Sequence, residues 1–100
     1  PGDADAYYNL GIYYLNSADT LTARRFFDRA LATGNHLDSR LYLAKIAEKQ
    51  HDFDSAITYL RERIRLKTSE DDAYAEEARR HLFDLMRMLG KIDSTGKVIE

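Results

Sequence analysis

The feature that most constrains the fold of this chain is an internal repeat with a period of 33 residues. Large and small apolar residues recur at this spacing (43 minus 10, 56 minus 23 and 60 minus 27 all give 33): Leu10-Gly11 matches Leu43-Ala44, Ala23 matches Ala56, and Phe27 matches Leu60. Periods of roughly 20–50 residues are typical of repeat proteins, in which each unit is one supersecondary element. The repeat therefore predicts stacked copies of one structural unit.

The repeating unit is predicted to be helical. The only proline is Pro1, so no later position interrupts a helix by ring geometry. Tyr7, Leu10, Gly11 and Tyr14 follow the i, i+3, i+4, i+7 spacing of one helix face, and no segment alternates as a strand would. We expect five helices, at about residues 3–16, 20–33, 36–49, 53–66 and 70–89, with room for a sixth, short helix after Asp93 or Ser94 in segment 91–100.

Residues between these segments match the chemistry of helix ends. Asp19 or Thr20, Asp52 and Ser69 are placed to accept hydrogen bonds from the free amides at helix starts. Gly34 is placed to end the second helix, since glycine adopts the left-handed conformation without a side-chain penalty. Because the turns are short, consecutive helices are expected to pack antiparallel.

At these positions the chain resembles the tetratricopeptide repeat family. The first helix of that motif carries an aromatic residue, Leu-Gly and Tyr, and the second carries Ala, Phe and Ala. In this sequence the roles fall on Tyr7, Leu10-Gly11, Tyr14, Ala23, Phe27 and Ala30. The second copy is weaker, and the third departs at Glu77 and His81, where Leu and Tyr are usual. Segment 30–35 is also similar to the related Sel1-like repeats.

This resemblance implies an all-α fold, a right-handed α-α superhelix of antiparallel helical hairpins. Repeat one would span about 4–36, repeat two about 37–70, and a third, partial repeat about 71–100, within a single domain or fragment. Gly11 and Ala23 would let the paired helices approach closely, with large side chains filling the space beside them. Because the chain begins with Pro1 rather than Met, we expect a fragment or a processed product.

Composition excludes several classes of partner. The net charge is −2, and 44% of residues are hydrophobic, which is an ordinary soluble balance without a field that would attract nucleic acid. The arginines alternate with acidic residues, as on a solvated helix face. No apolar run is long enough to span a membrane. The absence of cysteine excludes disulfides and thiolate metal sites, and leaves a cytoplasmic or a periplasmic location equally open.

No catalytic or cofactor site is expected. His36, His51 and His81 are scattered over turns and separate helices, and they lack metal-ligand spacing. Glu70 and its acidic neighbours suit the positive end of a helix dipole. The sequence shows no nucleophile with its base and no phosphate loop. We therefore expect neither an enzyme nor a metal or cofactor.

The resemblance places partner-binding residues on the concave surface, which the first helix of each pair would line. Aromatic and aliphatic side chains there would bury parts of an extended peptide, amides would pair with its backbone, and cations would hold carboxylates. The candidates are Tyr8, Asn9, Ile12, Asn16, Leu41, Tyr42, Lys45, Lys49 and Arg79. Alternatively, these faces pack on neighbouring repeats or on another copy of the chain.

The sequence thus predicts a protein-interaction scaffold that binds a peptide segment or a protein surface. One alternative is a structural or oligomerisation module, in which the exposed faces meet a second copy as a homo-oligomer. The other is a helical accessory domain of a larger enzyme or regulator.

Overall fold

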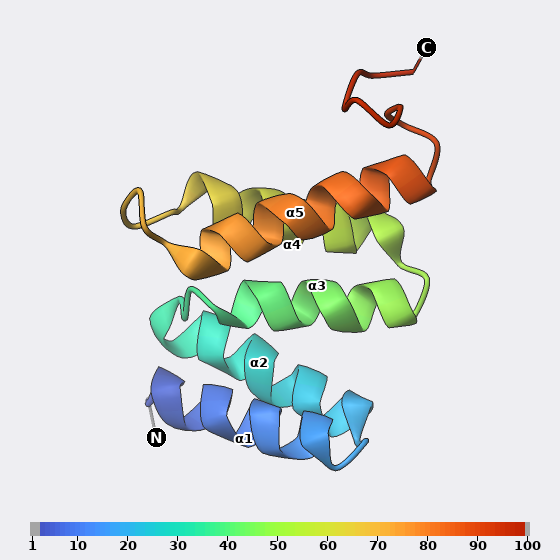
Figure 1. Cartoon of the computed structure of the whole chain (residues 1–100). Coiled ribbons are helices and arrows are strands. Elements are labelled where there is room, and N and C mark those ends of the chain that lie inside the picture. The colour runs from blue at the N-terminus through green and yellow to red at the C-terminus, as the bar shows by residue number, and fades with distance from the viewer. Residues whose placement is uncertain (1–2, 100) are drawn as a thin grey trace.

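The computed structural model describes residues 3–99, which fold into five α-helices. They are α1 (Ala4–Asn16), α2 (Thr20–Gly34), α3 (Ser39–Lys49), α4 (Phe53–Arg65) and α5 (Ala73–Met88). Helices α1 and α2 form one hairpin, α3 and α4 form a second, and α5 packs against α4 (Figure 1). The stack is elongated, with extents of 47 × 30 × 19 Å, and α1 lies at one edge of it. The predictions of an all-α fold and of five helices are confirmed.

The first hairpin depends on a close approach between Gly11 of α1 and Phe27 of α2. A Cβ atom added at Gly11 would lie 2.6 Å from Cε1 of Phe27, whose side chain is fully buried. In the second hairpin the equivalent residues are Ala44 and Leu60, and both are fully buried. One hairpin thus pairs the smallest residue with a phenyl ring, and the other pairs a methyl group with a smaller aliphatic side chain. The summed volume of the two residues is therefore nearly the same in both hairpins, as the close packing of protein interiors requires.

The 33-residue period extends to the backbone of the turns. Asp19 and Asp52 cap α2 and α4, and each accepts a hydrogen bond of 3.2 Å from the backbone amide three residues later. The residues just before them, Ala18 and His51, both adopt left-handed conformations, with φ of 63° and 60°. Because non-glycine residues rarely adopt this conformation, its occurrence at both positions shows that the two turns share one geometry.

The ends of α2 and α3 differ from the sequence prediction. Gly34 is the last residue of α2, and Asn35 rather than Gly34 adopts the left-handed conformation, with φ of 51°. Helix α3 begins at Ser39 instead of at residue 36. His36 stays outside the helix because its ring stacks on Tyr8, with ring centroids 4.2 Å apart, and its Nδ1 contacts Oγ of Ser39 at 3.2 Å.

Helix α5 also begins later than predicted. Asp72 is its N-cap, and Oδ1 of Asp72 accepts a hydrogen bond of 3.1 Å from the amide of Ala75. The other oxygen, Oδ2, accepts from the amide of Thr68 at 2.9 Å and fixes the preceding loop. The prediction that Ser69 caps this helix is therefore wrong. One carboxylate with two anchored oxygens defines the helix start more strongly than a hydroxyl would.

The short helix for which the sequence left room after residue 91 does not form in the described residues 91–99. Ile92 and Val98 instead form an isolated antiparallel bridge, and Asp93 accepts hydrogen bonds from the amides of Thr95 and Lys97 across the turn. This local pairing between side chain and backbone competes with helix formation. Glu100, the end of the third predicted repeat, lies outside the described residues.

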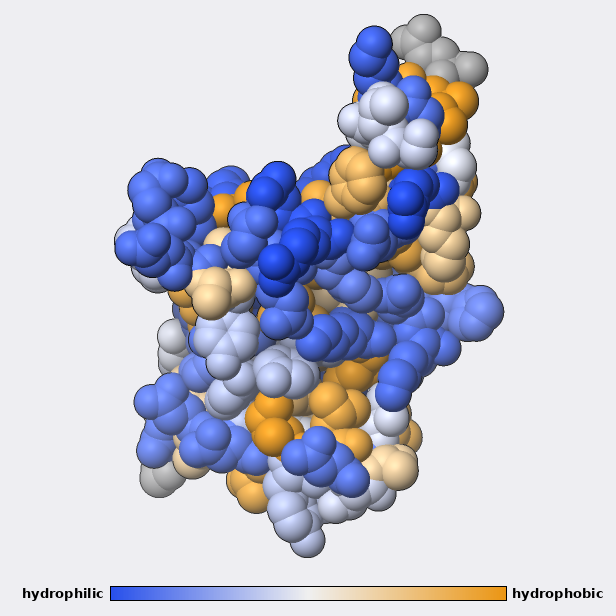
Figure 2. All heavy atoms as spheres, in the orientation of Figure 1, coloured by the Kyte–Doolittle hydropathy of each residue, from blue (hydrophilic) through white to orange (hydrophobic). Residues whose placement is uncertain are grey.

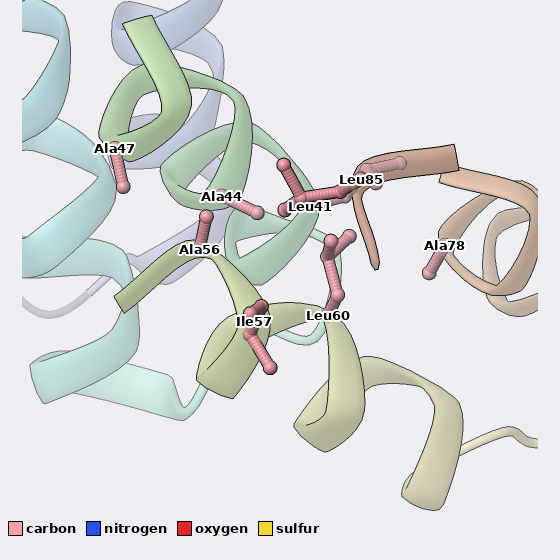
Figure 3. Close-up of a cluster of buried hydrophobic side chains, with 8 residues drawn as sticks. All are labelled: Leu41, Ala44, Ala47, Ala56, Ile57, Leu60, Ala78 and Leu85. Carbon is pink, nitrogen blue, oxygen red and sulfur yellow. The ribbon is translucent and has the colours of Figure 1, made fainter. Parts of the chain in front are cut away.

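The buried side chains form two clusters. The first joins α1, α2 and α3, and its fully buried members are Ala23, Phe27, Leu43 and Ile46. The second joins α3, α4 and α5, whose side chains point toward one another in Figure 3. Its buried members are Leu41, Ala44, Ala47, Ala56, Ile57, Leu60, Ala78 and Leu85. Tyr59 packs against both clusters, so the core is continuous along the stack.

A buried ion pair ties α5 to the second hairpin. The side chain of Arg63 is 3% exposed, and its guanidinium donates to Asp38 at 3.1 Å and to Asp72 at 2.8 Å. These partners lie before α3 and at the start of α5, so one α4 side chain links three segments. A buried charge is tolerated when it is paired and hydrogen-bonded in this way.

The Gly11–Phe27 contact leads to a stability prediction. We expect Gly11→Ala to lower the free energy of unfolding by roughly 1–3 kcal/mol, since the new methyl group would overlap the Phe27 ring. Urea denaturation followed by circular dichroism measures the change. Asn9→Ala, at an exposed position of the same helix, should change it by less than about 0.5 kcal/mol. Equal stability of Gly11→Ala and the wild type would contradict the packing.

The Asp72 cap leads to a pH prediction. Hydrogen bonds from the amides of Thr68 and Ala75, together with Arg63, hold the pKa of Asp72 well below its usual range. Its contribution to stability is therefore present above the unfolded-state pKa of about 3.9 and is lost as the pH falls below that value. We expect the stability of Asp72→Asn to depend less on pH between pH 5 and pH 2 than that of the wild type.

Urea denaturation across this pH range tests the Asp72 prediction. Asp71→Asn, which changes the same charge on the exposed neighbouring residue, should keep the wild-type pH dependence. If the free energy of unfolding changed with pH in the same way for the wild type and Asp72→Asn, the ionised cap would not contribute to stability.

Candidate functional site

Helices α1, α3 and α5 contribute side chains to one surface, which we call the first-helix face. The rings of Tyr8 on α1 and Tyr42 on α3 are 5.8 Å apart and nearly perpendicular. Glu48 of α3 and His81 of α5 are joined by a contact of 2.6 Å between Oε2 and Nε2. In the view of Figure 2, hydrophobic side chains gather between α1 and α3, and hydrophilic ones cover α3 and α5. The face therefore has an aromatic part and a charged part.

The aromatic part is anchored in the first cluster. Tyr42 stacks on Phe27 with ring centroids 5.3 Å apart, and Tyr8 meets the same ring at 5.9 Å. Both tyrosines are half-buried, so each has one side in the core and the other side toward solvent. Burial raises the pKa of Tyr8 well above its usual value, with a further contribution from Tyr42. The Tyr8 hydroxyl therefore remains protonated at neutral pH and can donate a hydrogen bond.

Three cations were predicted to hold carboxylates of a partner: Lys45, Lys49 and Arg79. Two of them, Lys45 and Arg79, already pair with carboxylates of this chain. Nζ of Lys45 lies 2.9 Å from Oε2 of Glu77, and Nη2 of Arg79 lies 2.7 Å from Oε1 of Glu76. Lys49 is exposed and forms no ion pair with any residue of the described range 3–99. Lys49 is therefore the cation on this face that is freest to meet an external carboxylate.

An open hollow of about 420 Å³ lies between α3 and α5. Its lining consists of Lys45, Glu48, Lys49 and His81. The sequence prediction named both lysines as partner-binding, but it did not include His81 among the partner-binding residues. The spacing of 33 residues between Glu48 and His81 could have indicated their contact, since matching positions on successive first helices lie side by side.

Arg79 lies away from this hollow. It belongs to a separate depression beside the loop between α4 and α5, which also includes Ile64, Lys67, Ser69, Glu70, Asp72, Ala75 and Glu76. The structure therefore does not bring Arg79 together with Tyr8 and Tyr42, although all three were predicted on one binding surface.

Leu41 is not available to a partner. Its side chain is only 1% exposed and packs in the second cluster against α4 and α5, so its assignment to the binding surface is wrong. Ile12 is half-buried against the first cluster, whereas Asn9 and Asn16 are exposed on α1. Helix α3 packs against both α2 and α4, and Leu41 lies in the cluster that α3 shares with α4 and α5, which accounts for its burial.

Metal-ligand clusters and membrane-spanning helices are both absent from residues 3–99. Within residues 3–99, no three His, Cys, Asp or Glu side chains are grouped closely enough to hold a metal ion. In the same part of the chain, none of the helices has the length and apolar character needed to cross a bilayer.

Comparisons of the chain with protein-family models, with curated proteins and with solved structures found no significant match.

Tyr42 packs on the core, whereas Lys49 is exposed, so substitutions at these two positions should differ in their effect on stability. We expect Tyr42→Ala to lower the free energy of unfolding by about 2 kcal/mol or more, because it removes the ring that stacks on Phe27. Lys49→Ala should change it by less than about 0.5 kcal/mol, since Lys49 is exposed. Thermal and urea denaturation measure both. Equal effects of the two substitutions would contradict the described packing of Tyr42.

Proposed function

We propose that this protein is an interaction scaffold, and that it binds an extended peptide segment of a partner protein along the first-helix face. The observation that carries the proposal is the open hollow between α3 and α5, whose lining residue Lys45 also lies over the ring of Tyr42, with Nζ 5.2 Å from the ring centroid. Such an arrangement offers an anchoring place for apolar side chains next to polar groups that fix orientation, as interfaces commonly do.

The chemistry of the face supports an extended segment as the ligand. Exposed Asn9 and Asn16 offer amide donors and acceptors for a peptide backbone, and the Tyr8 hydroxyl adds a donor. Lys49 offers an unpaired cation for a carboxylate. Lys45 is held by Glu77, and His81 is held by Glu48, so these groups shape the hollow more than they attract charge. The ligand is therefore an apolar segment with an acidic residue near one end.

The 33-residue period and the shared turn geometry of Ala18 and His51 support assignment to the tetratricopeptide class, with Sel1-like character at residues 30–35. The proposed architecture is a right-handed α-α superhelix in which α1, α3 and α5 line the inner surface. We assign this face no catalytic step, because Lys45 is paired with Glu77 and His81 contacts Glu48, so these side chains are engaged with one another.

A peptide-display selection tests the proposal. A random peptide library would be selected on the immobilised full chain, and enriched peptides would be titrated against variants by fluorescence anisotropy. We expect the enriched peptides to bind with dissociation constants in the micromolar range. The double variant Asn9→Ala with Lys49→Glu should weaken binding by at least about tenfold, since it removes a backbone contact and reverses a charge.

The matched control is Thr58→Ala with Arg61→Glu, which changes the net charge by the same amount; both residues are exposed on α4, which lies behind α5 in Figure 1. These changes should leave the affinity unaltered. A loss of binding in the α4 variant alone would place the site on the opposite side of the stack. Failure to enrich any peptide would overturn the proposal.

A further inference from the structure

Helix α3 carries a buried stripe that packs on the preceding helix. Ser39, Leu43 and Ile46 follow the i, i+4, i+7 spacing of one helix face and are 0%, 2% and 1% exposed. Leu43 and Ile46 share the first cluster with Ala23 and Phe27 of α2. Through this stripe α3, the first helix of the second hairpin, packs on α2, the second helix of the first hairpin.

Helix α1 carries the same stripe, 33 residues earlier, but it is exposed. Its members are Ala6, Leu10 and Tyr13, and the last two are 40% and 63% exposed. No helix of the described part covers them, because α1 lies at the edge of the stack (Figure 1). The stripe lies on a different side of α1 from Tyr8 and Ile12, which belong to the first-helix face.

The charged side chains of the segment that carries this stripe are all acidic. Residues 3–19 contain Asp3, Asp5 and Asp19 and none of the fifteen lysines and arginines of the chain. The helix that covers the equivalent α3 stripe is basic on balance, since α2 carries three arginines and one aspartate. One of these, Arg24, donates from Nη1 to Gln50 at the end of α3 at 3.2 Å.

We propose that the Ala6–Leu10–Tyr13 stripe is a docking surface for an amphipathic helix of a partner protein. That helix has the chemistry of α2 on its contact side. It carries a small residue followed four positions later by a large apolar one, as Ala23 and Phe27 do, and basic residues at its rim. The contact extends an interface that the chain already forms internally, and it does not depend on peptide binding at the first-helix face.

A labelled synthetic peptide with the sequence of residues 19–35 serves as the probe, because it reproduces the α2 stripe and its arginines. Titrated against the full chain, it should bind, and Leu10→Ser with Tyr13→Ser should weaken that binding by at least about tenfold. Raising the salt concentration should weaken binding to the wild type, because the attraction is partly ionic.

One control changes the protein away from the stripe, and the other changes the peptide. Met88→Ser removes a side chain that is 61% exposed on α5 and should leave the affinity unchanged. A peptide in which Phe27 is replaced by serine should bind at least about tenfold more weakly than the parent peptide. Unchanged affinity in the Leu10–Tyr13 variant would overturn the proposal, since the peptide would then be bound elsewhere.

Light scattering across a range of protein concentrations, without peptide, distinguishes a partner from a second copy. We expect a monomer at every concentration. A dimer that Leu10→Ser with Tyr13→Ser dissolves would show that a second copy of the chain occupies the stripe, and the proposal of a separate partner would be wrong.

Discussion

The close approach of α1 and α2 at Gly11 sets the geometry on which the rest of the stack depends. A helix surface without a side chain at that point admits the Phe27 ring, and Phe27 in turn supports both Tyr8 and Tyr42. The aromatic part of the candidate site is thus a direct consequence of a missing methyl group. In the second hairpin the equivalent positions hold Ala44 and Leu60, and both side chains are fully buried.

Helix α3 has the central place because it belongs to both clusters. Leu43 and Ile46 face α2, whereas Leu41 and Ala44 face α4 and α5. A helix enclosed in this way has only a narrow exposed strip, and the site residues Tyr42, Lys45 and Lys49 occupy it. The ion pair of Lys45 with Glu77 and the contact of His81 with Glu48 then hold α3 and α5 in register, so this part of the face is ordered before any ligand arrives.

Much of the fold could be predicted from the sequence, because helix positions and the 33-residue period depend on local spacing. The errors have tertiary causes. His36 leaves the predicted third helix to stack on Tyr8, and Asp72 replaces Ser69 as a cap because Arg63 and Thr68 also bind it. The pair of Arg79 with Glu76 lies at i, i+3 on one helix, so it follows from local spacing. In contrast, the approach of Tyr8 to Tyr42, the burial of Leu41 and the ion pair of Lys45 with Glu77 depend on how neighbouring helices are placed. Spacing along one helix does not contain that information.

The division of the core into two clusters joined through α3 has a consequence for local opening. Each outer helix is secured mainly by its immediate neighbour, so α1 or α5 can detach while the remaining cluster stays closed. Amide hydrogen exchange would then be slowest in the middle of α3 and faster toward both edges of the stack. A protein built in this way can lose order at one end while the opposite end retains its native packing, and each end responds separately to whatever binds there.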